Sequence, residues 1–82
     1  MALYFITYDL AKSQNNEALL DELRELGALR VLKSKWCFSS DNTSAIELRN
    51  RFKSVVDGDV SFLLSEVSDW ASQNLDVTPN DL

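Results

Sequence analysis

The sequence predicts an α+β domain in which two helices pack on one face of an antiparallel sheet. Three observations predict this fold class. The chain opens with an almost continuously apolar stretch, two later stretches repeat apolar residues at helical spacing, and β-forming residues follow each of them. The 82 residues leave room for one core only, and because 45% of them are hydrophobic we expect order nearly throughout.

The first predicted strand covers residues 2 to 8, "ALYFITY", which are rich in aromatic and branched side chains. Such a run is typical of a central strand that is covered on at least one face. A polar connector over residues 12 to 16 follows. Four leucines then recur at helical spacing: Leu19, Leu20, Leu23 and Leu26. We therefore expect an amphipathic helix over residues 15 to 26, with Gly27 at its C-terminal cap.

Residues 28 to 38, "ALRVLKSKWCF", return to β-forming chemistry. This stretch forms either one long strand or two short strands that bend near Ser34 and Lys35. No Gly or Pro marks a turn, so the sequence leaves both arrangements open.

The second helix is predicted to begin after Ser44, because Ser44 and Glu47 have the spacing of a capping box, in which each side chain satisfies the other's backbone N–H. An apolar stripe continues it: Ala45, Leu48, Phe52, Val55 and Val56. "DGD" at 57 to 59 predicts a turn, and "VSFLLSEV" at 60 to 67 predicts the last strand. This order of elements predicts a ferredoxin-like βαββαβ domain over residues 1 to 67.

The C-terminal tail, residues 68 to 82, is more polar and contains the only proline. Trp70 and Leu75 would leave a large apolar surface in water if this tail were free. We expect the tail to pack on the chain's own sheet or on that of a partner. A small core and open sheet edges also favour a homodimer.

The chain contains no histidine and a single cysteine, Cys37. The lack of histidine excludes Ser–His and Cys–His nucleophiles and zinc sites with imidazole ligands. Any bound metal is therefore expected to be a hard ion held by oxygen, Mg²⁺ or Mn²⁺. Cys37 cannot form an internal disulfide, and we expect it to be a small buried hydrophobic residue.

We also expect a cytoplasmic protein without a membrane partner. A lone cysteine fits a reducing compartment, and no apolar run approaches the length that spans a bilayer. The N-terminus lacks the basic region and the apolar stretch of a signal peptide.

The formal net charge of −5 is unevenly distributed along the chain. Residues 30 to 53 hold six of the eight basic side chains against two acidic ones, so this stretch carries +4 and the remainder −9. Because phosphate contacts are local, a basic stretch can bind nucleic acid within an acidic protein. The other interpretation is a set of solvated helix and strand faces.

Tyr8 and Asp9 end the first strand, where a βαβ connection faces the start of the first helix. Asp9 has two ordinary roles at such a place, which are to accept backbone N–H bonds and to face the helix dipole. A third role is that of a metal ligand, if two copies bring two Asp9 carboxylates together around a twofold axis. Tyr8 either positions Asp9 by a hydrogen bond or completes the strand.

"YFITYD", a helix and then "RVLKSKWCF" resemble the small CRISPR-associated nuclease family, here called the Cas-two family. Its members open with an apolar strand that ends in Tyr-Asp and continue with an Arg-Val-Gln-x-Ser-Val-Phe pattern. Five residues of this chain match those patterns: Tyr8, Asp9, Arg30, Ser34 and Trp36. Leu32 stands where the family usually has Gln. The likeness covers residues 1 to 67 and extends to virulence-associated protein D-like toxins and to SinR-like bacterial proteins.

The resemblance implies a ferredoxin-like homodimer with one of two functions. It is either a non-catalytic module that binds nucleic acid or protein, or a magnesium-dependent nuclease in which paired Asp9 carboxylates hold the ion, with Tyr8 and Arg30 beside them. The residues expected to contact nucleic acid are Lys12, Arg30, Lys33, Ser34 and Lys35. The sequence favours the non-catalytic module, because the chain is acidic and its connector after Asp9 carries only one basic residue.

Overall fold

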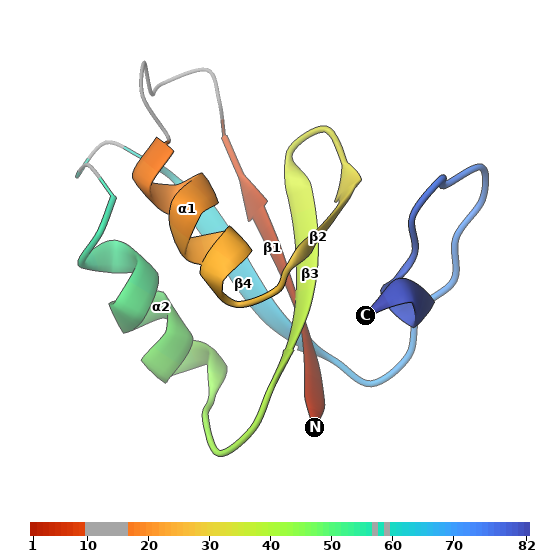
Figure 1. Cartoon of the computed structure of the whole chain (residues 1–82). Helices are drawn as coiled ribbons and strands as arrows, with labels where there is room; N and C mark the ends of the chain where they lie inside the picture. Colours follow the sequence, from red (N-terminus) through yellow and green to blue (C-terminus); the bar gives the residue numbers. More distant parts are fainter. Residues whose placement is uncertain (10–16, 57, 59) are drawn as a thin grey trace.

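The computed structural model describes residues 1–9, 17–56, 58 and 60–82, and Figure 1 shows both helices on one face of a single sheet. Six elements follow in chain order: β1 (Ala2–Tyr8), α1 (Glu17–Glu25), β2 (Leu29–Leu32), β3 (Lys35–Ser40), α2 (Ala45–Lys53) and β4 (Phe62–Val67). A short 3-10 helix, η1 (Pro79–Asp81), comes after them. The strand order is β2-β3-β1-β4, and each neighbouring pair is antiparallel. This small α+β architecture confirms the predicted class and is compatible with a ferredoxin-like arrangement, to which η1 is an unpredicted addition.

The first helix ends as the sequence predicts. Gly27 has a φ of 72°, a left-handed conformation that glycine adopts without steric cost. Its N–H donates to the carbonyl of Arg24 at 3.0 Å, and the N–H of Ala28 donates to that of Leu23 at 3.0 Å. These two bonds form a Schellman cap. The predicted helix is therefore confirmed over Glu17–Glu25, whereas residues 15 and 16 lie outside the described residues.

The stretch from residue 28 to 38 forms two strands, which answers the question that the sequence left open. β2 and β3 pair as an antiparallel hairpin, and Lys33 and Ser34 form the turn between them. The register of this pair is irregular between Arg30 and Leu32. No glycine or proline is needed, because side-chain contacts described below close the turn.

The second helix begins at the predicted place, with only half of the expected capping box. The N–H of Glu47 donates to the Ser44 hydroxyl at 3.2 Å, but the Glu47 carboxylate accepts from the Thr43 hydroxyl at 3.1 Å instead of capping in return. The helix ends at Lys53, so Val55 falls beyond it and is 36% exposed rather than part of the buried stripe. Residues 57 and 59 of the expected turn lie outside the described residues. Within the described ranges, no helix has both the length and the apolar character to cross a membrane.

The core lies between the two helices and the sheet face that they cover. Alternate residues of β1 point into it, and β3, both helices and Ala28 complete it: Tyr4, Ile6, Tyr8, Leu19, Leu23, Ala28, Trp36, Phe38, Leu48 and Phe52. Phe38 stacks on Tyr4 with ring centroids 5.6 Å apart and meets the edge of Phe52 at 6.0 Å. Each fully buried side chain of this size stabilises the fold by roughly 1.5–3 kcal/mol.

The C-terminal tail lies on the side of the sheet away from the helices (Figure 1, blue). Phe5 and Val31 of the sheet and Trp70, Leu75 and Pro79 of the tail line a cavity of about 140 Å³. Cys37, whose neighbours Trp36 and Phe38 belong to the core on the helix side, is fully buried on this opposite face. Burial raises the pKa of its thiol, a bond with the Leu29 backbone lowers it, and Asp81 of η1 raises it again. Cys37 is thus the buried small residue that the sequence predicted.

Candidate functional site

Several residues of the two motifs meet where β1 ends. Tyr8 is only 4% exposed, and its phenol oxygen accepts a hydrogen bond from Trp36 Nε1 at 3.1 Å. The backbone N–H of Tyr8 donates to the carbonyl of Ser34 at 3.2 Å. The Tyr8 side chain therefore completes the core beside Trp36, and the hydroxyl that the sequence offered as a positioning group for Asp9 points to the indole.

Arg30 holds the turn of the β2–β3 hairpin. Its Nε and Nη2 donate to the carbonyl of Lys33 at 3.0 and 2.6 Å. Its guanidinium carbon also lies 5.8 Å from the centre of the Trp36 ring. These contacts explain how the turn forms without Gly or Pro, and they fix a positive charge beside the hairpin tip.

The remaining predicted contact residues are distributed around that tip. Lys33 is exposed at the turn, and Ser34 is half-buried with its carbonyl bound to Tyr8. Lys35 lies on the opposite face of the sheet, where its Nζ is 5.0 Å from the centre of the Phe5 ring. Lys12 lies outside the described residues.

Asp9 is exposed at the rim of an open depression of about 530 Å³. Its backbone N–H donates to the carbonyl of Ser61 at 2.9 Å, which extends the β1–β4 ladder by one step. Among the described residues that line the depression, which are Thr7, Tyr8, Asp9, Ser61, Phe62 and Leu63, Asp9 carries the only carboxylate. In the part of the chain that is described, no three His, Cys, Asp or Glu residues gather as metal ligands. One carboxylate does not fit the oxygen-rich shell of Mg²⁺ or Mn²⁺, so the described residues of a single copy do not provide that site.

A surface that the sequence reasoning missed runs along β4. Two further depressions open beside the first: one of about 360 Å³ between α2 and the start of β4, and one of about 230 Å³ between α2 and β4 itself. Arg49 lines both of them. Leu63 is 71% exposed and Ile46 is 66% exposed. We call this the β4 surface and define it by Ile46, Arg49, Phe62, Leu63, Leu64 and Glu66. Three consecutive apolar residues at the start of the last strand were its only sequence signal, because they place an apolar side chain on each face of that strand.

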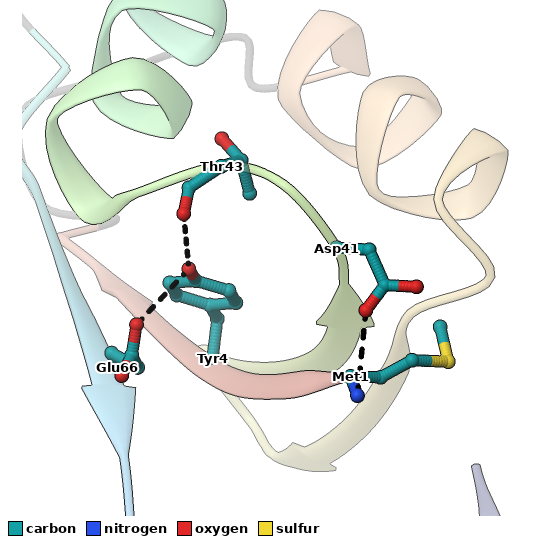
Figure 2. Close-up of polar contacts among 5 residues, drawn as sticks. All are labelled: Met1, Tyr4, Asp41, Thr43 and Glu66. Carbon is teal, nitrogen blue, oxygen red and sulfur yellow. Dashed lines mark hydrogen bonds and ion pairs between the residues drawn. The ribbon is translucent and has the colours of Figure 1, made fainter.

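Glu66 is held at the other end of β4 by a buried tyrosine, as Figure 2 shows. The Tyr4 hydroxyl lies 3.2 Å from Oε1 of Glu66 and 3.3 Å from the carbonyl of Thr43, so both can accept its proton. Burial raises the pKa of Tyr4, and the Glu66 carboxylate raises it further. Nearby, the N-terminal ammonium lies 3.4 Å from the Asp41 carboxylate. The phenol therefore stays a donor at neutral pH and fixes the orientation of Glu66.

The basic residues of the middle stretch do not form one surface. Arg30, Lys33 and Lys35 belong to the hairpin at the β2 edge of the sheet. Arg49, Arg51 and Lys53 belong to α2, which packs against β4 at the opposite edge. Arg51 is also paired with Glu22 of α1. A nucleic acid would therefore meet the hairpin and α2 as two separate positive sites.

No family model matches the chain, and no solved structure matches it significantly. The resemblance to the Cas-two family stays a prediction that rests on individual residues. Four of those residues, Tyr8, Arg30, Ser34 and Trp36, are connected by the contacts at the end of β1.

Proposed function

We propose that this protein is a non-catalytic, homodimeric module of the Cas-two type, with a ferredoxin-like fold, that binds nucleic-acid phosphates through its β2–β3 hairpin. The charge of that hairpin is the observation that carries the proposal. Residues 28 to 40 contain three basic side chains and no acidic one, within a chain of net charge −5. Such a local excess of positive charge can attract phosphate although the whole protein is acidic.

The geometry of the hairpin supports this role. Arg30 is already ordered by the Lys33 carbonyl and the Trp36 ring, so it loses little conformational freedom when phosphate approaches. Lys33 stands exposed at the turn. Lys35 lies against Phe5 and extends the positive charge to the other face of the hairpin. The hairpin thus offers cations on both sides of its tip.

The nuclease alternative has weaker support. Its Mg²⁺ or Mn²⁺ ion would draw on the Asp9 carboxylates of two copies, because the described residues around this depression contribute one carboxylate in each copy. The histidines that serve most often as general acid or base are lacking in the chain. We therefore favour binding over hydrolysis.

The test is fluorescence anisotropy with labelled duplex DNA and, separately, duplex RNA, starting at ~50 mM salt. The doubly substituted Lys33→Gln/Lys35→Gln variant should bind more weakly, and the slope of log affinity against log salt should flatten by about 2. Arg24→Gln/Lys53→Gln is the matched control, because it removes two exposed cations from the helices. It should keep the native slope.

Equal losses in the two variants would show non-specific attraction and would contradict the assignment to the hairpin. No binding of either nucleic acid at ~50 mM salt would contradict the nucleic-acid proposal and leave a protein as the partner.

A further inference from the structure

β4 is an edge strand whose outer side is unpaired within the described chain. It is the last strand in the order β2-β3-β1-β4, and it pairs with β1 in unbroken register from Leu3–Val67 to Tyr8–Phe62. The β4 surface beside it combines an exposed cation with the two exposed apolar side chains Ile46 and Leu63. A long, regular and partly apolar edge of this kind is a template for pairing with another strand.

The direction of the backbone groups on this edge follows from the ladder. The N–H of Asp9 bonds to the carbonyl of Ser61. In an antiparallel ladder every second pair exchanges hydrogen bonds, so every second pair from Thr7–Leu63 to Leu3–Val67 does so as well. The intervening residues, Phe62, Leu64 and Glu66, therefore turn their N–H and carbonyl groups to the open side. Their side chains lie on the helix face, opposite Tyr8, Ile6 and Tyr4.

We infer that β4 pairs antiparallel with β4 of a second copy around a twofold axis through Leu64, which gives one continuous sheet. Only a register centred there aligns all three outward-facing residues: Leu64 meets its own counterpart, and Phe62 meets the partner's Glu66. The inference specifies the interface of the homodimer in the proposed function, and it does not depend on nucleic-acid binding.

Charge complementarity supports this register. Arg49 lines the depression that Phe62, Leu63 and Leu64 share with α2, and among the described residues its guanidinium donates only to the neighbouring Asn50, at 3.3 and 3.1 Å. The partner's Glu66, opposite Phe62, enters the same region. Tyr4 has already oriented that carboxylate in each copy through Oε1. The twofold axis forms the Arg49–Glu66 pair twice, so Arg49 and Glu66 of each copy both find an opposite charge in the partner.

The apolar part of the β4 surface is also self-complementary. On the sheet face away from the helices, Leu63 lies opposite the partner's Ser65, and the two Leu63 side chains become diagonal neighbours within reach of each other. Pairing thus covers the most exposed leucine of β4, which is 71% exposed in the single chain.

This interface separates the two Asp9 residues. Asp9 is bound to Ser61 at the start of β4, and Ser61 of one copy would lie opposite the partner's Val67. The two Asp9 residues would therefore stand about 20 Å apart along the strands. They could not share a metal ion, which agrees with a non-catalytic module.

The first test compares two leucines at opposite edges by sedimentation velocity at micromolar concentration. Leu63→Lys should turn the dimer into a monomer, because it places two ammonium groups beside each other at the axis. Leu32→Lys is the matched control, since Leu32 is 54% exposed at the β2 edge, and it should leave the dimer intact. A native protein that sediments as a monomer, or a dimer lost in Leu32→Lys alone, would overturn the inference.

The second test is a charge exchange that still decides the question if Leu63→Lys fails to fold. Arg49→Glu should raise the dimer dissociation constant at least about tenfold, since it opposes two carboxylates. The double variant Arg49→Glu/Glu66→Arg should restore the affinity lost by either single change. Lys53→Glu changes the same charge elsewhere on α2 and should have little effect. A double variant as weak as the worse single one would contradict the pairing of Arg49 with the partner's Glu66.

Discussion

The two edge strands of the sheet, β2 and β4, differ in length, regularity and charge. β2 has four residues, an irregular register against β3, and a hairpin tip that carries Arg30 and Lys33. η1 also lies against it. β4 has six residues in regular register against β1, and it exposes Leu63 beside the apolar Ile46.

This difference shows how a small sheet can pair through one edge only. Irregular pairing, cations and a covering segment are the features by which proteins prevent edge-to-edge association, and all three occur at β2. In the described chain, β4 has regular pairing and no covering segment, and the cation beside it, Arg49, meets the partner's Glu66 in the inferred pairing. A domain of this size buries a smaller fraction of its unfolded surface than a larger domain does, so pairing through β4 also adds stability that the single chain lacks.

The largest expected effect concerns the C-terminal tail, which covers the sheet beside β2. A chain ended after Val67 loses the tail that shares a cavity with Phe5 and Val31. Cys37 should then react with Ellman's reagent at least about a hundredfold faster, because the thiol no longer waits for a local opening. Cys37→Ser in the full chain is the control for background reaction. An unchanged rate would mean that the tail does not protect Cys37 or the sheet beside β2.

A smaller effect on stability should distinguish Arg30, in β2, from Arg49, which lies beside β4. Arg30→Ala should cost about 1 kcal/mol of unfolding free energy at every protein concentration, because it breaks bonds within one chain. Arg49→Ala should lower the melting temperature only at concentrations where the native protein is dimeric. Thermal melts across a dilution series measure both. A concentration-independent loss in Arg49→Ala would place the role of Arg49 inside the single chain.

The bond of Tyr4 to Glu66 of β4 should make the stability of the folded state depend on pH. Its pKa is raised above 10.0 by burial and by Glu66, so the protonated phenol stabilises the folded state fully below that pH. As the pH rises above it, the unfolded chain ionises first and this contribution is lost. Tyr4→Phe should therefore melt below the native protein at neutral pH, and the gap should narrow in alkali. A gap that widens with pH would contradict the sign of the shift.

The smallest expected effect is that of metal. If the two Asp9 residues stand apart in the dimer, added Mn²⁺ should leave the melting temperature of the native protein and of Asp9→Asn equally unchanged. A rise in the native protein that Asp9→Asn lacks would bring the two carboxylates together and contradict the β4 dimer.

Periodicity predicted the elements well, because the buried residues of β1, α1 and α2 follow strand or helix spacing closely. It could not predict the turn at Lys33 and Ser34, since that turn depends on the Arg30 guanidinium reaching a backbone carbonyl and not on turn-forming residues. The motifs located Tyr8 and Arg30 at one end of the sheet. The β4 surface was beyond sequence reasoning, because only the strand order places β4 at an edge and Arg49 beside it.

Amide hydrogen exchange along β4 tests the dimer most directly. In a single chain, the amides of Leu63, Ser65 and Val67 bond to β1 and should exchange slowly, whereas those of Phe62, Leu64 and Glu66 face the open edge and should exchange fast. In the dimer, all six should exchange slowly, and the alternation should return on dilution or in Leu63→Lys. Fast exchange at Phe62, Leu64 and Glu66 in a sample that sediments as a dimer would show that another surface forms the interface.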